Sequence, residues 1–214
     1  MKYAIGTVVG ATLLGLAKSS LLGSKNNGVE VYSVEELRQH ANDPNLAPLV
    51  TRVYLYGKNL TTLPPEIGNL KNLKTLSLNW NQLTTLPPEI GKLINLEDLY
   101  LNNNQLTTLP PEIGNLKKLK ELILSHNQLT TLPPEIGNLK NLNYLALYDT
   151  LITTIPLEIG KLKKLKGLNL DKNPNFYMNP EQLHQLIING ANKKIQRTII
   201  EANVIPTISN VRLR

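Results

Sequence analysis

The stretch L-T-T-L-P-P-E-I-G at residues 60–68 decides the fold, because it recurs. Identical copies begin at Leu83, Leu106 and Leu129, each 23 residues after the one before, and an altered copy, I-T-T-I-P-L-E-I-G, begins at Ile152. A fixed period in this range indicates a repeat architecture, in which each unit buries its apolar face against its neighbours. The chain is therefore predicted to stack its repeats into one elongated domain.

A second pattern, L-x-x-L-x-L-x-x-N-x-L, leads into each copy, as at residues 73–83, 96–106 and 119–129. The L-x-L core has a period of two residues, so we expect a β-strand whose leucines face inward. The prolines that follow suit the first turn of a short helix, where the helix dipole also favours Glu66 and its equivalents. The next glycine, Gly68 in the first copy, is expected to permit the bend into the following strand.

These repeats resemble the 23-residue leucine-rich repeats of the Scribble/Erbin and plant intracellular Ras-group types, which many bacteria also carry. The resemblance covers about residues 50–173. It implies an α/β fold: a right-handed solenoid with a parallel β-sheet on the concave face and short helices on the convex face. It also implies a role in protein recognition, without naming the partner.

The asparagine column of the motif is predicted to be structural. These amides are expected to be buried and to bond to the backbone of neighbouring coils, because an irregular buried turn needs such partners. The column consists of Asn81, Asn104, Asn127 and Asn173. The asparagine is missing at Lys58 and Thr150. A threonine hydroxyl can still bond to the backbone, whereas Lys58 cannot be a buried equivalent, so we expect an imperfect ladder at the first coil.

Helical caps are predicted at both ends of the repeats. Residues 24–49 form the N-terminal cap, with a strand at 29–32 and a helix opened by a capping box from Ser33 to Glu36. Residues 50–175 hold five complete repeats and one partial repeat. Residues 176–214 form the C-terminal cap, with one helix from 179 to 189 and a second from 192 to 202. The second helix is predicted to bury Ile195, Ile199 and Ile200.

The first 23 residues have a different composition from the rest. Lys2 precedes an uncharged run at residues 3–17, which ends in Gly15-Leu16-Ala17 with small residues at the positions of a cleavage site. The run is shorter than the roughly 20 residues that a membrane-spanning helix needs. A cleaved signal peptide that exports the protein is favoured. An uncleaved membrane anchor and a cytoplasmic protein remain open.

Catalytic and metal-binding patterns are not recognised. The chain has no cysteine, which excludes thiolate metal sites and cysteine nucleophiles. Its three histidines, His40, His126 and His184, lie in different elements. We expect no enzymatic activity, no metal and no cofactor.

The net charge is +7, and lysines form runs at residues 117–120 and 161–166. These runs are expected to form a solvated convex edge. Without interleaved aromatic residues they do not indicate a specific nucleic-acid site.

The residues that flank the L-x-L cores are the candidate binding surface. They include five of the eight tyrosines and the only tryptophan, in a chain that is 5% aromatic. Such residues are enriched at binding hot spots, although they are also favoured at exposed strand positions. The predicted partner-binding residues are Arg52, Tyr54, Tyr56, Asn79, Trp80, Asp98, Tyr100, Asn102, Asn103, Glu121, Ile123, His126, Tyr144, Tyr148 and Asp149.

Two function classes follow. The preferred one is a monomeric, non-enzymatic module that binds a protein or an extended peptide on the concave face. The alternative is an envelope- or surface-associated structural or adhesion protein, which uses its basic face to hold an acidic membrane or polymer.

Overall fold

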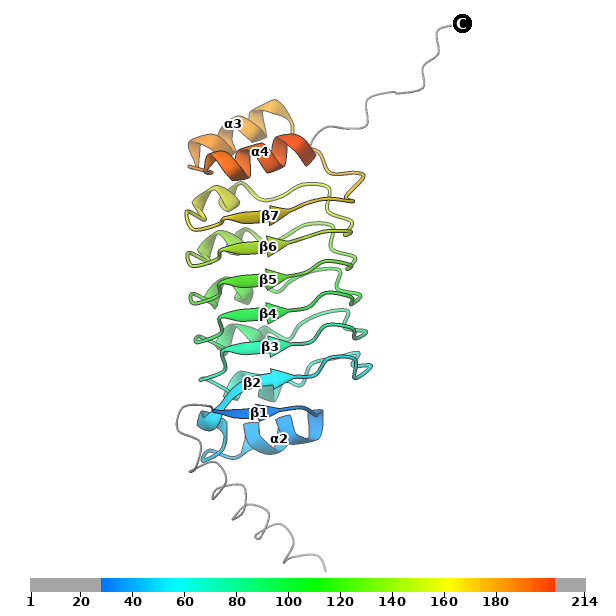
Figure 1. Ribbon diagram of the computed structural model, residues 1–214, viewed down its shortest axis with the longest axis vertical. Helices are drawn as coiled ribbons and strands as arrows, with labels where there is room; N and C mark the ends of the chain where they lie inside the picture. The colour runs from blue at the N-terminus through cyan, green and yellow to red at the C-terminus, as the bar shows by residue number, and fades with distance from the viewer. Residues whose placement is uncertain (1–27, 203–214) are drawn as a thin grey trace, which may run out of the picture.

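The computed structural model describes residues 28–202 and contains one parallel sheet of seven strands in chain order. Each strand from β2 onward pairs with the next at an offset of 23 residues, as in Leu76 with Leu99 and Leu99 with Leu122. Each repeat is therefore one coil of a solenoid (Figure 1), which confirms the predicted architecture. The strands are β1 (Val29–Val31), β2 (Val50–Tyr54), β3 (Thr75–Ser77), β4 (Asp98–Tyr100), β5 (Glu121–Ile123), β6 (Tyr144–Ala146) and β7 (Gly167–Asn169).

Some predicted segments lie outside the described residues. These are the signal peptide or anchor at 1–23, the start of the N-terminal cap at 24–27, and residues 203–214 of the C-terminal cap. None of the helices within residues 28–202 is long and apolar enough to cross a membrane.

The core is a column of aliphatic side chains between the sheet and the helices behind it. In a typical coil Leu99, Leu101 and Leu106 have no exposed surface, and Ile113 closes the same layer from the helical side. Burying such a side chain contributes about 1.5–3 kcal/mol relative to leaving it in water. The L-x-L prediction is confirmed in every coil.

The asparagine column bonds consecutive coils together. The side-chain nitrogen of Asn81 donates to the carbonyl oxygens of Leu55 (2.7 Å) and Leu78 (2.9 Å), and its oxygen accepts from the backbone N–H groups of Lys58 and Leu60. Asn104, Asn127 and Asn173 repeat the two donor bonds, and the oxygen of each accepts from one backbone N–H of the preceding coil; all four asparagines are buried. The structural role predicted for these amides is confirmed.

Short 3-10 helices form the layer behind the sheet, and from the second of them onward each begins directly after the first proline of its repeat. The glutamates lie in their first turns, as predicted, and Glu89 and Glu158 also pair with Lys92 (3.9 Å) and Lys161 (3.7 Å). The helices are η1 (Ala47–Leu49) before β2, and then η2 (Pro65–Asn69), η3 (Pro88–Lys92), η4 (Pro111–Asn115), η5 (Pro134–Asn138) and η6 (Leu157–Lys161).

The glycine of each repeat is needed for a reason other than the predicted bend of the backbone. Gly114 does not have a positive φ. A Cβ atom at this position would lie 2.6 Å from the backbone oxygen and 2.7 Å from the Cβ of Glu135 in the next coil. Gly91 and Gly137 meet their neighbours in the same way. The glycine is therefore required because adjacent coils approach closely, and not because the chain turns there.

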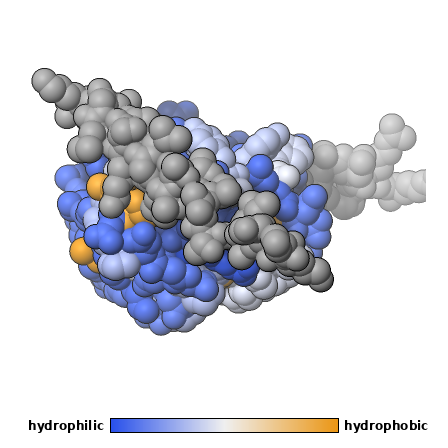
Figure 2. All heavy atoms as spheres, turned by 90° about the horizontal axis from the view of Figure 1, so that it is seen from below, coloured by the Kyte–Doolittle hydropathy of each residue, from blue (hydrophilic) through white to orange (hydrophobic). Residues whose placement is uncertain are grey.

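Helix α2 (Val34–Asn42) covers the N-terminal end of the solenoid and buries Leu37 and Ala41. Its capping differs slightly from the prediction: the Ser33 hydroxyl accepts from the N–H of Glu36 (3.1 Å), but the Glu36 carboxylate accepts from Tyr32 instead of Ser33. Seen from this end, the described side chains in Figure 2 are mostly hydrophilic. A polar end is what a terminal unit needs to stop the stacking of further coils.

Helices α3 (Pro180–Ile188) and α4 (Lys193–Ala202) cover the other end, with α3 against η6 and α4 against β7. The predicted Asn179 cap is present: its side chain accepts from the Gln182 N–H, and the Gln182 side-chain oxygen accepts in return from the Asn179 N–H. One core prediction is wrong: Ile195 and Ile199 are buried, but Ile200 is 49% exposed. Residues four apart share a helix face, whereas Ile200 is turned about 100° from Ile199 and faces solvent.

Candidate partner-binding site on the open face of the sheet

The constant register sorts the solvent-facing side chains of the sheet into rows. We call this surface the open face. The first row runs through paired positions on all seven strands: Glu30, Arg52, Thr75, Asp98, Glu121, Tyr144 and Gly167. The second row contains Tyr54, Ser77, Tyr100, Ile123, Ala146 and Asn169. Ala146 is buried, so the second row is interrupted on β6.

A third row follows the strands directly. Backbone hydrogen bonds continue past the strand ends, for example from Trp80 N–H to the Asn102 carbonyl (3.0 Å) and from His126 N–H to Tyr148 (2.9 Å). These bonds continue the pairing of neighbouring coils through the turn residues. The third row contains the predicted residues Tyr56, Asn79, Asn102 and Tyr148.

A fourth column lies beside the third and has an unusual backbone. Trp80, Asn103, His126 and Asp149 have φ values of 58°, 57°, 55° and 54°, in the left-handed region. Glycine, asparagine and aspartate tolerate this region, but a bulky aromatic residue rarely adopts it. Gly57 takes the equivalent place in the first coil, with φ of 64°. Lys172 continues the column with φ of 56°, and Trp80 is the bulkiest residue in it, with a side chain that is 58% exposed.

At the N-terminal end, tyrosines gather around a carboxylate. The rings of Tyr32 and Tyr54 stack with centroids 5.5 Å apart, and Glu30 accepts from Tyr32 and from Arg52 (2.5 Å). These two bonds, the one from Tyr32 being the stronger influence, hold the pKa of Glu30 below its usual value. A shallow hollow lies here, lined by Glu30, Tyr32, Tyr54, Tyr56 and Lys58.

Glu30 and Tyr32 were missed in the predicted site. Both belong to the predicted N-terminal cap. Its strand joins the edge of the sheet as β1, and Glu30 thereby extends the first row beyond Arg52. The alternating pattern V-E-V-Y at residues 29–32 could have predicted their place on the open face, because it puts both side chains on the side opposite the buried Val29 and Val31.

The centre of the open face is acidic. Asp98 and Glu121 are opposite each other on β4 and β5, and neither forms an ion pair with a described residue. Asp98 accepts a long hydrogen bond from the Thr75 hydroxyl (3.4 Å), and Tyr100 donates to Glu121 (3.2 Å). Burial, followed by the charges of Glu121 and Glu97, raises the pKa of Asp98.

The C-terminal end of the open face has a linked group of polar and aromatic side chains. His126 Nδ1 lies 3.0 Å from a carboxylate oxygen of Asp149, and the His126 ring meets Tyr148 edge-on at 5.3 Å. The ammonium of Lys172 lies 5.1 Å from the centre of the Tyr148 ring. The structure thus gathers nine of the predicted residues into three clusters. The other six lie outside these clusters, in the rows or in the left-handed column: Asn79, Trp80, Asn102, Asn103, Ile123 and Tyr144.

Most lysines of the predicted basic edge have bonds within the fold. Lys117 and Lys140 donate to the glycine carbonyls three residues before them (2.7 and 2.6 Å), and Lys163 does the same at 3.3 Å. Burial, and then the neighbouring Lys161, Lys117 and Lys163, lower the pKa of Lys140. These lysines bond to the last carbonyls of the 3-10 helices, which is a structural use.

A family model described as a leucine-rich repeat region matches residues 45–127 and 112–202. These matches cover more than half of the 214 residues. The chain belongs to the leucine-rich-repeat family. The matching description names no subtype, so the resemblance to Scribble/Erbin repeats stays a prediction. No curated protein matches the chain.

Solved leucine-rich-repeat structures are similar to this chain. The ectodomain of the receptor kinase SOBIR1 from Arabidopsis thaliana has 32% identity and a TM-score of 0.52, over 59% of this chain and 72% of that one. The ectodomain of GASSHO1/SCHENGEN3 from the same plant, in complex with CASPARIAN STRIP INTEGRITY FACTOR 2, has 27% identity and a TM-score of 0.56 over 76% of this chain.

A leucine-rich-repeat protein of Leptospira interrogans has 33% identity over 72% of this chain, with a TM-score of 0.44. This leucine-rich-repeat chain is shorter than several of its relatives. It spans 49% of the Leptospira protein and 22% of the GASSHO1/SCHENGEN3 ectodomain. Within residues 28–202, no group of three or more histidine, aspartate or glutamate side chains is placed to hold a metal ion.

Proposed function

We propose that the chain is a non-enzymatic protein-interaction module, which holds a partner protein or an extended peptide across the open face. The observation that carries the proposal is the contrast between scaffold and surface. The buried leucines and asparagines repeat from coil to coil, whereas most positions of the open face differ between successive coils, Asn79 and Asn102 of the third row being an exception. Six spacings of about 4.8 Å make this face about 29 Å long, which is enough for an extended peptide or the edge of a domain.

The comparisons support the same class. The GASSHO1/SCHENGEN3 ectodomain was solved with a bound factor, and a structure of PEPR1 with AtPEP1 has 28% identity and a TM-score of 0.53. The open face offers what such recognition uses, namely aromatic area with polar tips beside hydrogen-bonding groups.

The test begins with a pull-down that identifies a partner, followed by affinity measurements on variants of the open face. Trp80→Ala and Tyr144→Ala are expected to weaken binding by about 1–3 kcal/mol each, as hot-spot residues do. Tyr177→Ala is the matched control, because Tyr177 is 48% exposed but is not part of the strand rows or of the left-handed column. Equal affinities for all three variants would place the binding surface elsewhere.

We further propose that the segment 1–23 directs the protein out of the cytoplasm. The charge at Lys2, the uncharged run and the small residues before Lys18 motivate this proposal. The N-terminal residue of the mature protein, determined from its native cell, tests it. A start near Lys18 supports cleavage and export. Retention of Met1 in a membrane fraction supports an anchor, and retention in a soluble fraction contradicts export.

A further inference from the structure

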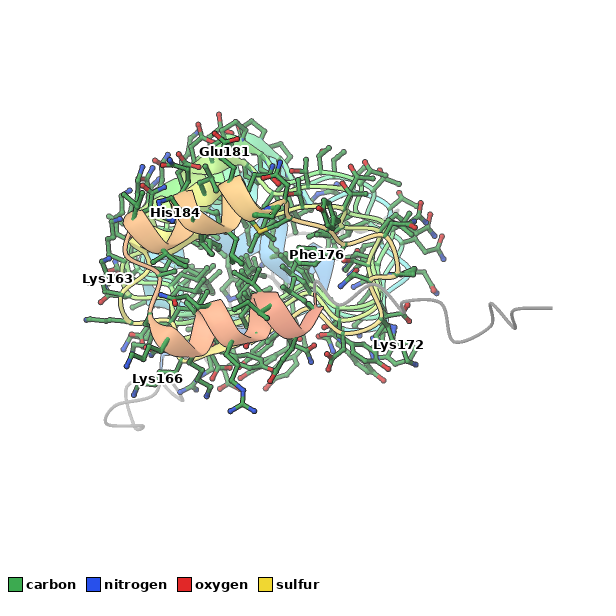
Figure 3. The ribbon with its side chains drawn as sticks, turned by 90° about the horizontal axis from the view of Figure 1, so that it is seen from above. Lys163, Lys166, Lys172, Phe176, Glu181 and His184 are labelled. Atoms are coloured by element: carbon green, nitrogen blue, oxygen red, sulfur yellow. The ribbon has the colours of Figure 1, made fainter. Side chains whose placement is uncertain are left out.

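A lateral hollow lies where the loop before β7 meets the start of α4. It is lined by Lys163, Lys164, Lys166 and Lys194, together with Asn143 and Asn192. In Figure 3, Lys163 and Lys166 lie on the side of the molecule where α4 begins, and Lys172 lies on the opposite side. No carboxylate lines the hollow.

The hollow has a rigid frame. The side-chain nitrogen of Asn192 donates to the Leu165 carbonyl (2.9 Å), and its oxygen accepts from Ile195 N–H (3.0 Å), so this residue ties α4 to the loop. Lys163 donates to the carbonyl of Gly190 (2.7 Å), and Lys164 donates to Asn141 (2.7 Å). These two ammonium groups are held in place and still contribute their charge.

Lys166 and Lys194 differ from the other two lysines, because their ammonium groups have no hydrogen-bond or ion-pair partner within residues 28–202. An internal comparison is available: Lys120 stands at the position equivalent to Lys166, two coils earlier, and forms an ion pair with Glu97. In the coil before Lys166, the position equivalent to Glu97 is Asn143, which has a neutral amide instead of a carboxylate. Lys166 therefore lacks the negatively charged partner that Glu97 provides for Lys120.

The position of Lys194 at the start of a helix is also unfavourable for a cation. Lys193 and Lys194 stand in the first turn of α4, which has no acidic residue, whereas α2 and α3 have Glu35, Glu36 and Glu181 in their first turns. The helix dipole disfavours cations at this end. Neither a carboxylate in the hollow nor the helix dipole therefore offsets the positive charge gathered here.

We propose that this hollow binds the phosphate groups of a linear polyanion. Ammonium groups are compact point charges that suit phosphate oxygens, and a phosphate would supply the counter-charge that Asn143 lacks. A concave site favours groups that project from a chain into it over the flat surface of a bilayer. The site lies on the flank of the solenoid, separate from the open face, so a partner and a polyanion could be bound together.

The test measures binding of inorganic polyphosphate to the full chain by calorimetry at low and moderate salt. The double variant Lys166→Gln/Lys194→Gln is expected to weaken binding by on the order of tenfold or more. Lys71→Gln/Lys74→Gln is the matched control, because Lys71 and Lys74 stand at the positions of Lys163 and Lys166 in an early coil and the same charge is removed. The control is expected to change the affinity by less than about threefold.

A second variant separates binding from folding. Lys194→Glu is expected to raise the melting temperature slightly, since it places an acid in the first turn of α4, and to abolish polyphosphate binding. Vesicles of phosphatidylcholine with one quarter phosphatidylglycerol test a lipid source for the phosphate. Equal losses in both double variants, absence of polyphosphate binding, or binding to vesicles alone would each overturn the proposal.

Discussion

The phenol of Tyr100 donates a hydrogen bond of 3.2 Å to Glu121 on the neighbouring strand, at the centre of the open face. Burial, and then the negative charges of Asp98 and Glu121, raise the pKa of Tyr100 to about 12. The folded chain therefore holds this proton more tightly than the unfolded chain does. The contribution of Tyr100 to stability is fully present below the ordinary tyrosine pKa of 10.0 and is lost as the pH rises through about 12.

A tyrosinate absorbance titration tests this relationship. Tyr100→Phe is expected to remove the component that titrates last in the wild type, and to leave the other tyrosines unchanged. Circular dichroism on the same samples defines the pH range in which the chain is folded. A Tyr100→Phe titration that overlays the wild type would show that Tyr100 is not held by Asp98 and Glu121.

Replacement of Asp98 by asparagine is expected to stabilise the fold at pH 7. Because the pKa of Asp98 is raised from 3.8, its ionisation in the folded state lowers stability as the pH rises above that value. The gain in Asp98→Asn is therefore expected at pH 7 and is expected to be absent at pH 3, where the carboxyl group is protonated. Urea unfolding at both pH values measures it, and an equal gain at both would rule out the charge as its cause.

Trp80 occupies a backbone conformation that suits asparagine better. Trp80→Asn is expected to be more stable than Trp80→Ala by about 1 kcal/mol, because both variants lose the ring but only asparagine tolerates the left-handed region well. Thermal unfolding of the two variants makes the comparison. If the proposed function holds, both lose affinity for the partner to a similar extent. Equal stabilities would show that the positive φ at Trp80 stores no strain.

Gly114 allows two coils to approach closely. Gly114→Ala would place a Cβ atom 2.6 Å from the Glu135 backbone oxygen, so it is expected to lower the free energy of unfolding by about 1–3 kcal/mol. Asn115→Ala, next to it on the exposed side of the same helix, serves as the control and is expected to change stability little. Hydrogen exchange should show the loss of protection mainly in the coils on either side of residue 114.

Thr150 is the weakest buried link of the asparagine column. Its single hydroxyl proton is shared between two acceptors, the Asn173 side-chain oxygen (2.7 Å) and the Leu147 carbonyl oxygen (3.2 Å), whereas an asparagine amide has two N–H donors. Thr150→Asn is expected to stabilise the chain by about 1 kcal/mol, by restoring the second bond to the preceding coil. Thr153→Asn, at an exposed position in the same coil, should leave the melting temperature unchanged. A lower melting temperature for Thr150→Asn would mean that the amide does not fit.

Much of the scaffold follows from the sequence alone. The 23-residue period sets the pairing offset, and the L-x-L alternation identifies Leu99 and Leu101 as buried. The need to satisfy buried backbone groups at each turn identifies Asn104 as one of the asparagines that bond consecutive coils together. These features are predictable because each depends on one repeat and on the need to bury apolar groups and satisfy backbone polar groups. The family follows from the same pattern.

The tertiary structure alone decides how the coils meet. Stacking explains why Gly114 has no side chain, brings β1 and Tyr32 to the open face, and aligns Trp80 with a column of left-handed residues. It also distinguishes Lys120, which has a carboxylate partner, from Lys166, which has none among the described residues. The physical reason is that these properties arise between residues about one coil apart, whose contacts depend on the spacing and angle of stacked backbones rather than on any local pattern.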